Sequence, residues 1–220
     1  MNENQPLDRS FLIKQGKIID GTGNPWFRGD ILINNGKISE ISHHISNKNV
    51  DEVIDAPSFI VSPGFIDIHT HSDYTIFLSR GENILSQGVT THVVGNCGFS
   101  MTPINTNRSQ DDEDYTQFRS MLAMMDTEFT FNRLSDYLEG LRKKGIPINI
   151  IPLIGHSTLR IHTLGLENRT PTENEMTEMK EILEEEMKAG AFGMSTGLDY
   201  PPGSFAKTAE IIELCEIVKK

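Results

Sequence analysis

Two histidines and a cysteine are the side chains of this sequence whose types and spacing best suit metal chemistry. His69 and His71 lie two residues apart at the end of the apolar stretch PGFIDIHTHSD, residues 63–73. Along a β-strand, alternate side chains share a face, so two such imidazoles converge on one point. Imidazole nitrogen is the commonest metal ligand in proteins and suits zinc. The pair alone is weak evidence, because two polar residues in a turn give the same pattern.

A cysteine in a glycine-rich turn strengthens this interpretation. Cys97 lies near the end of the stretch GVTTHVVGNCGFS, residues 88–100, and follows His71 by 26 residues, about one strand–helix unit. It is therefore expected at the same edge of the sheet as the histidines. A thiolate is a strong zinc ligand, and the alternative is a small buried apolar residue. The flanking Asn and Gly residues favour the ligand. Cys215 lies in an apolar helical pattern and is expected to pack there.

Three further polar residues follow predicted strands. His156 comes directly after the apolar stretch 146–155, so a role beside the site and a structural role are both open. Tyr200 lies in the loop STGLDYPPG, residues 195–203, which either shapes a pocket or simply connects two elements rigidly. Asp73 directly follows the histidines and is expected to be a turn or helix-cap residue.

The elements that must position these residues fall into two parts. In the first part, residues 1–62, short alternating apolar segments are separated by turns, and Asn35-Gly36 is a strong hairpin signal. We expect a small antiparallel β unit over residues 11–42 that continues through residues 53–61. From residue 63 to residue 220, apolar strands alternate with helical stretches.

The alternation in residues 63–220 predicts an α/β fold. Strands are predicted near residues 65–68, 90–94, 146–155 and 191–196, and helices over residues 76–86, 131–144, 172–188 and from 208 onward. Residues 101–128 are polar and Met-rich and are expected to hold some helix. Continuous apolar strands separated by helices indicate a parallel sheet covered on both faces. Four such units are half of a (β/α)8 barrel, and a complete open, doubly wound sheet is the structural alternative.

Composition excludes some classes of partner. The 220 residues carry a net charge of −11, with 20 basic residues that form no stripe, so neither nucleic acid nor an anionic membrane is an expected partner. The first ten residues hold no apolar signal segment, and no apolar run approaches the roughly 20 residues of a membrane span. The cytoplasm is the expected location. A disulfide between the two cysteines has little support from their contexts.

Taken together, these stretches resemble the N-acyl-D-amino-acid deacylase (D-aminoacylase) branch of the metal-dependent amidohydrolase superfamily. The likeness covers nearly the whole chain. The His-Thr-His strand marks only the superfamily, whereas the Asn-Cys-Gly turn and the STGLDYPPG loop are more specific to this branch. The resemblance implies a TIM-like (β/α)8 barrel beside a small β-sandwich. Residues 1–62 would then supply sandwich strands, and residues 63–220 would supply the first four barrel units.

The resemblance also implies roles for individual residues. His69 and His71 match the paired histidines that hold one metal, and Cys97 matches the cysteine that bridges toward a second, tighter zinc. Tyr200 matches a loop that lines the substrate pocket, and His156 is a second candidate for substrate binding. Zinc is the implied cofactor, and a small-molecule N-acyl-D-amino acid is the implied substrate. The products would be a carboxylate and a D-amino acid.

The family has further parts that this sequence does not contain. Two more zinc-binding histidines, the catalytic aspartate and the groups that bind the substrate carboxylate come from later strands, beyond the position matched by residue 220. We therefore expect the chain to be the amino-terminal portion of a deacylase, with the carboxyl-terminal half missing. The alternatives are a non-catalytic fragment or pseudo-enzyme half, and another amidohydrolase such as a cyclic-amide hydrolase, which shares the His-x-His strand but does not require the Asn-Cys-Gly turn.

Overall fold

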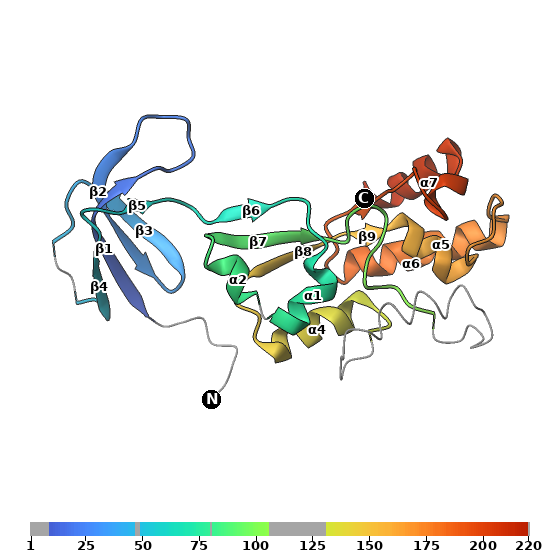
Figure 1. The fold of residues 1–220 in the computed structure, drawn as a ribbon, viewed down its shortest axis with the longest axis horizontal. Coiled ribbons are helices and arrows are strands. Elements are labelled where there is room, and N and C mark those ends of the chain that lie inside the picture. The colour runs from blue at the N-terminus through green and yellow to red at the C-terminus, as the bar shows by residue number, and fades with distance from the viewer. Residues whose placement is uncertain (1–8, 47–48, 80, 106–130, 220) are drawn as a thin grey trace. The chain divides into compact units, whose positions relative to one another are not determined.

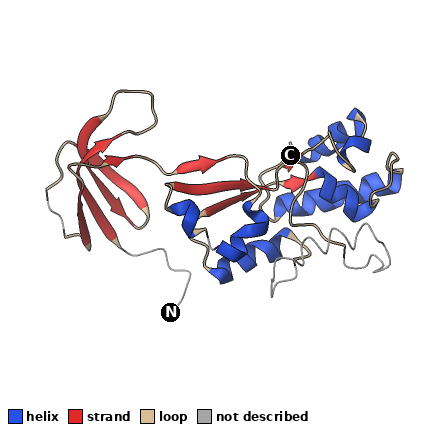
Figure 2. Ribbon diagram, viewed as in Figure 1, coloured by secondary structure: helices blue, strands red, loops and turns tan. Residues whose placement is uncertain are grey.

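The computed structural model describes residues 9–46, 49–79, 81–105 and 131–219. The chain forms two compact units, one that ends at Gly64 and one that begins at Phe65. Figure 2 shows that strands and loops make up the first unit, whereas helices and strands are interleaved in the second.

The first unit is built on one five-stranded sheet in the order β3-β2-β1-β4, with β5 also paired to β1 (Figure 1). Its strands are β1 (Ser10–Ile18), β2 (Phe27–Asn34), β3 (Lys37–Ser42), β4 (Glu52–Asp55) and β5 (Ile60–Val61). The hairpin between β2 and β3 is confirmed, because Asn35 and Gly36 both have positive φ, 51° and 72°. The expectation of an antiparallel unit is correct for β1, β2 and β3 only. Both β4 and β5 run parallel to β1, so the sheet is mixed.

The second unit contains parallel strands, as the strand–helix alternation predicts. A three-stranded sheet has the order β6-β7-β8, and a separate two-stranded ladder pairs β9 with β10. The strands are β6 (Phe65–Asp67), β7 (Val89–Val94), β8 (Asn149–Pro152), β9 (Ile154–Gly155) and β10 (Met194–Ser195). The strand predicted over residues 146–155 is therefore two short strands, β8 and β9, and the one predicted over residues 191–196 is only two residues long.

Helices connect these strands. They are α1 (Ser72–Ser79), α2 (Glu82–Leu85), α4 (Leu134–Lys144), α5 (His156–Thr163), α6 (Glu173–Lys188) and α7 (Thr208–Val218), with a short 3-10 turn at Gly203–Phe205. Helices predicted at α4, α6 and α7 are confirmed. Helix α5, residues 156–163, was not among the helices predicted from the sequence. Most of the polar, Met-rich stretch 101–128 lies outside the described residues.

An apolar core joins these helices to the strands of the second unit. It includes Ile76 and Phe77 of α1, Tyr137 of α4, and Leu183 of α6, and it reaches Leu214 of α7. The described residues hold no helix long and apolar enough to cross a membrane.

One expectation about the strands is wrong. The sequence predicts that β6 is buried, yet Phe65, Ile66 and Ile68 are 62%, 59% and 73% exposed. The reason is that β6 lies at the edge of its sheet and pairs with β7 alone among the described strands. A strand with one partner leaves backbone groups unpaired along its free side, and its side chains lack neighbours from a second strand.

Candidate metal centre

The three side chains singled out from the sequence come together in the structure. The ligand atoms of His69, His71 and Cys97 all lie within 4.8 Å of one another. The Nε2 atom of His69 is 3.1 Å from the Sγ atom of Cys97. The two imidazole rings meet edge to face, with centroids 5.8 Å apart. Within the part of the chain that the structure describes, this is the one trio of His, Cys, Asp or Glu side chains close enough to share an ion.

The histidines converge for a reason that differs from the predicted one. Alternation along a strand was expected to align them, but β6 ends at Asp67, so both histidines follow the strand in a bend. The Asp67 carboxylate accepts a hydrogen bond from the backbone N–H of His69, at 3.1 Å. This short-range bond tightens the chain where it leaves the strand. The two imidazole rings are therefore brought together by the bend after β6, and not by the alternation of side chains along a strand.

The cysteine is presented by a tight turn that follows β7. Cys97 has a φ of 55°, in the left-handed region that costs free energy for any residue with a side chain. Gly95 and Gly98 beside it also have positive φ, 78° and 77°, which glycine adopts without that cost. The two glycines thus allow the turn, and the strained cysteine between them is held in place by its surroundings.

A buried amide connects the two ligand segments. The side chain of Asn96 donates hydrogen bonds to the carbonyl of Thr70, between the two histidines, at 3.2 Å and to the carbonyl of Val93 in β7 at 2.8 Å. Asn96 thus links the His-Thr-His bend to the cysteine turn. The sequence analysis used Asn96 only as part of the Asn-Cys-Gly motif. Its position directly before Cys97 is the signal from which a tethering role could have been inferred.

This donor set fits a zinc-like ion. Two imidazole nitrogens and one thiolate are borderline-soft ligands of the kind that zinc prefers, whereas Mg²⁺ and Ca²⁺ take oxygen ligands. Both histidines are exposed and Cys97 is half-buried, so an ion can reach all three. Zinc usually takes four ligands, so these three side chains would supply most, but not all, of its coordination.

A polar pocket of about 390 Å³ opens beside His71. Asp67, Ser72 and His92 are among the residues that line it. The Nδ1 atom of His92 lies 2.6 Å from the hydroxyl of Ser72. Burial lowers the pKa of His92, although Asp67 opposes this effect. A hydrogen bond to Ser72 therefore fixes the ring of His92 at the wall of this pocket.

Asp73 supports the cysteine turn from below. It lies in the first turn of α1, is almost completely buried, and accepts a hydrogen bond from the backbone N–H of Gly95 at 3.2 Å. Burial raises the pKa of Asp73 to about 7, although the bonds from backbone N–H groups oppose this effect. Its other carboxylate oxygen has no partner. The sequence indicated that Asp73 is a turn or helix-cap residue, but not that its carboxylate binds Gly95, the residue after β7.

Tyr200 lies against the cysteine turn. Its hydroxyl donates a hydrogen bond to the carbonyl of Cys97, and its ring stacks on Phe99 with centroids 5.7 Å apart. Burial and the nearby Cys97 and Asp199 raise the pKa of Tyr200, so the hydroxyl keeps its proton and donates. Tyr200 is partly exposed, which leaves its ring accessible beside Cys97.

His156 lies in a different environment. It is the first residue of α5 and is fully buried, and its Nε2 atom is 2.7 Å from the carboxylate of Glu210 in α7. Arg160, also fully buried, donates to both oxygens of the same carboxylate at 2.8 and 2.7 Å. The structure does not bring His156 into the ligand trio, and its role in substrate binding stays a prediction. Cys215 is exposed rather than packed, and both cysteines are free.

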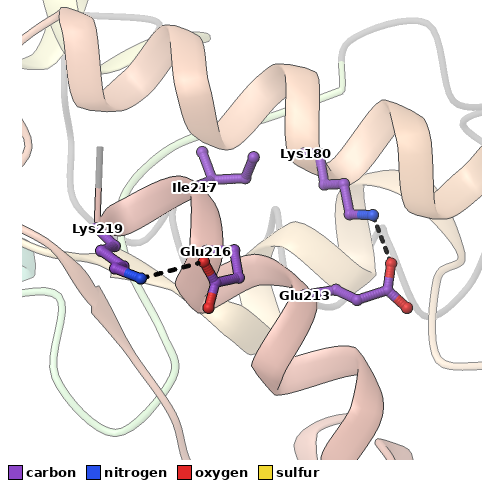
Figure 3. A pocket seen from close by; sticks show the side chains of 5 residues that line it. All are labelled: Lys180, Glu213, Glu216, Ile217 and Lys219. Atoms are coloured by element: carbon purple, nitrogen blue, oxygen red, sulfur yellow. Dashed lines mark hydrogen bonds and ion pairs between the residues drawn. The ribbon is translucent and has the colours of Figure 1, made fainter.

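Another pocket lies against α6 and α7 (Figure 3), and no residue of the ligand trio lines it. It has a volume of about 530 Å³ and is lined by Lys180, Glu213, Glu216, Ile217 and Lys219. Lys180 pairs with Glu213, and Lys219 pairs with Glu216 at 3.7 Å. The four charged side chains that line this pocket thus form two ion pairs with one another.

Comparison with known proteins shows the family to which the chain is similar. Residues 52–212 match the family described as "Amidohydrolase family". The chain is 37% identical to N-acyl-D-aspartate deacylase of Alcaligenes xylosoxydans xylosoxydans over 216 residues, which cover 97% of this chain and 42% of that protein. It is 36% identical to D-aminoacylase of the same organism over 217 residues, with the same coverage.

The fold is also similar to solved structures of such proteins. N-acyl-D-glutamate deacylase from Bordetella bronchiseptica, complexed with zinc and a phosphonate inhibitor, matches with a TM-score of 0.79 and 34% identity, over 96% of this chain and 43% of that one. A crystal structure of D-aminoacylase matches with a TM-score of 0.80 and 35% identity. The chain spans less than half of the length of these relatives. Since the family match covers most of the chain and includes the strands, the bend and the turn that carry the ligand trio, the chain belongs to the amidohydrolase family.

Proposed function

We propose that this chain carries part of the metal centre of a zinc-dependent hydrolase that cleaves the amide bond of N-acyl-D-amino acids. The observation that carries the proposal is the convergence of His69, His71 and Cys97 within 4.8 Å at the carboxyl ends of β6 and β7. Parallel α/β sheets place their active sites at this end. The names of the relatives supply the class of substrate.

We further propose an architecture for the whole protein. The parallel strands β6 to β10 with their helices would be the first four units of a (β/α)8 barrel, over residues 63–220. The strands before residue 62 would belong to a small β-sandwich. The exposed apolar side of β6 supports this arrangement, because a barrel pairs each strand on both sides.

The residues of this chain fit the requirements of amide hydrolysis in part. Zinc bound by His69, His71 and Cys97 would supply an activated water near neutral pH and would polarise the amide carbonyl. Tyr200, beside Cys97, is positioned to contact the acyl group of a substrate at the metal. The proton shuttle is expected from an aspartate outside this chain, since Asp73 is buried under Gly95 and is not accessible to a substrate.

Zinc binding tests the metal centre directly. We expect the 220-residue chain, stripped with chelator, to bind zinc in calorimetric titration, and we expect Cys97→Ala to weaken binding by more than tenfold because a thiolate ligand is lost. Cys215→Ala is the matched control, since it removes an exposed free thiol of α7. Equal losses in the two variants would contradict the assignment of Cys97 as a ligand.

Hydrolysis is tested with a longer polypeptide in which residues 1–220 replace the matching segment of the D-aminoacylase relative. Release of D-amino acid from N-acetyl-D-aspartate, N-acetyl-D-glutamate and N-acetyl-D-leucine is measured with and without zinc, and the L-enantiomers are the control. We expect turnover of D-substrates that depends on zinc and on Cys97. A chimera that folds and binds zinc but releases no D-amino acid would overturn the proposed activity.

A further inference from the structure

One serine hydroxyl closes both ends of the turn that carries Cys97. Ser195, the last residue of β10, donates a hydrogen bond from Oγ to the carbonyl of Gly95. The same Oγ accepts a hydrogen bond from the backbone N–H of Gly98 at 2.9 Å. Gly95 and Gly98 flank the residues Asn96 and Cys97, so this hydroxyl spans the base of the turn. The bonds connect residues 97 and 100 positions apart in the sequence.

The turn needs such external support. Gly95, Cys97 and Gly98 all have positive φ, a conformation that is unfavourable for a cysteine because of its side chain. A backbone in this state persists only where its surroundings determine it. Ser195 supplies two of the bonds that do so. Without them, the turn can relax and move the Sγ atom of Cys97 away from the imidazole of His69, which now lies 3.1 Å from it.

The segment that begins at Ser195 and the turn that carries Cys97 are also closely packed against each other. A Cβ atom on Gly98 would lie 2.8 Å from the backbone nitrogen of Gly197, and one on Gly197 would lie 2.3 Å from the carbonyl oxygen of Cys97. The segment that begins at Ser195 therefore packs directly on the cysteine turn. Tyr200 in the same segment donates its hydroxyl hydrogen to the carbonyl of Cys97.

We infer that Ser195 is a positioning residue, which holds Cys97 in the geometry of a metal ligand and connects that ligand to the loop that carries Tyr200. The inference rests on the proposed metal centre and adds a residue that the ligand trio does not include. Partners that orient metal ligands typically contribute ten- to hundredfold to metal affinity. The hydroxyl, rather than the size of the side chain, is the group that matters.

The experiment uses Co²⁺ alone as the probe, because a thiolate bound to cobalt gives a charge-transfer absorption band that zinc does not. The metal-free 220-residue chain is titrated with Co²⁺, and both the affinity and the intensity of this band at saturation are measured. We expect Ser195→Ala to lower the affinity about tenfold or more and to weaken the band. Ser204→Ala, at an exposed serine that follows the Tyr200 loop, is the control and should match the unmodified chain.

A pair of variants with the same shape separates the hydroxyl from packing. Ser195→Thr keeps the hydroxyl and should retain the affinity and the band, whereas Ser195→Val has nearly the same shape without a hydroxyl and should lose both. This pair also decides the question if Ser195→Ala does not fold, which circular dichroism shows. Equal behaviour of the Thr and Val variants would overturn the inference.

A double-mutant cycle tests whether Ser195 acts through Cys97. In a Cys97→Ala background, Co²⁺ can bind only through the histidines. Ser195→Ala should then change the residual affinity by less than about twofold, because an effect that acts through Cys97 is lost with that side chain and the two substitutions are non-additive. An equal loss in both backgrounds would show a general structural effect and overturn the inference. If the unmodified chain gives no thiolate band at all, the proposed metal centre fails instead.

Discussion

At the residue scale, the most unusual ionisable group near the metal centre is the carboxyl of Asp73. It is buried beneath the cysteine turn, and its unpartnered oxygen lies in a core with Tyr74 and Tyr137, whose hydroxyls also have no partner. Burial raises the pKa values of both tyrosines, and the Asp73 charge raises them further. All three groups are thus favoured in their neutral forms. A neutral Asp73 can still accept the hydrogen bond from Gly95.

The raised pKa of Asp73 predicts how stability depends on pH. The folded value is about 7 and the ordinary value is 3.8. Between these values the folded chain keeps a proton that the unfolded chain has lost, so the free energy of unfolding should fall as pH rises from about 4 to 7. Asp73→Asn should remove this contribution and be more stable above pH 7 by a few kcal/mol, on the order of 1.4 per pKa unit.

Urea unfolding of the metal-free chain at pH 5 and pH 8 measures this effect. Asp199→Asn is the matched control, because Asp199 is an exposed aspartate in the same part of the chain. If Asp73→Asn and the unmodified chain lose the same stability between the two pH values, then burial does not hold the proton on Asp73.

Some site residues could be predicted from the sequence and others could not. The difference lies in the chemistry of their side chains and in how far along the chain their contacts reach. His69, His71 and Cys97 were found because each ends a strand-like stretch and has a side chain with few other uses in such a place. Ser195 and Asp73 are common residue types whose contacts depend on tertiary packing. No local pattern shows that Ser195 meets residues near position 97.

At the element scale, buried charges fix α5 against α7. Glu210, on α7, binds both His156 and Arg160 of α5, and all three side chains are buried. Burial raises the pKa of Glu210, but the hydrogen bonds from His156 and Arg160 outweigh it, so the pKa is lowered. The carboxylate is therefore ionised and depends on these two partners. In the sequence, Glu210 is not distinguishable from the surface glutamates of the same helix.

Removing one partner from this group should be costly. Arg160→Met leaves the Glu210 carboxylate buried with less compensation, and such a change typically costs about 3–5 kcal/mol of unfolding free energy. Lys180→Met is the control, because the Lys180–Glu213 pair connects α6 to α7 at the surface, where a pair contributes about 1 kcal/mol or less. Denaturant unfolding measures both. Similar losses in the two variants would contradict the difference that burial implies.

Helix α6 shows what the sequence does determine at this scale. Thr172 and Glu175 have the spacing of a capping box, and in the structure the Thr172 hydroxyl accepts from the Glu175 N–H while the Glu175 carboxylate accepts from the Thr172 N–H. Such signals are local. Helix α5 has none, since His156 follows Gly155 without a side-chain cap. The parallel direction of β4 and β5 is likewise set by long-range pairing, which no turn residue shows.

The cap of α6 gives a prediction of known size. Thr172→Ala should lower the free energy of unfolding by about 1 kcal/mol, because the backbone N–H of Glu175 loses its partner. Thr177→Ala, at an exposed position inside the same helix, should be neutral or slightly stabilising, since alanine has the higher helix propensity. Thermal unfolding followed by circular dichroism distinguishes the two. A loss at Thr177 as large as that at Thr172 would exclude the cap as the cause.

At the scale of the whole molecule, the exposed apolar side of β6 sets how the chain behaves in solution. Phe65, Ile66 and Ile68 form an apolar row at the edge of a sheet, next to backbone groups that no described strand pairs. Large exposed apolar patches mark surfaces that contact other protein, and unpaired edges are templates for association. The metal ligand His69 follows this edge directly in the sequence.

We therefore expect the purified 220-residue chain to self-associate as its concentration rises, as measured by sedimentation velocity. Ile66→Lys should shift the equilibrium toward monomer, because a charge on an edge strand opposes pairing with another chain. Ile212→Lys is the matched control, since Ile66 and Ile212 are 59% and 57% exposed but Ile212 lies on helix α7. If Ile66→Lys and Ile212→Lys reduce association equally, general surface charge is the cause. If the unmodified chain stays monomeric at all concentrations, the β6 edge is not an association surface.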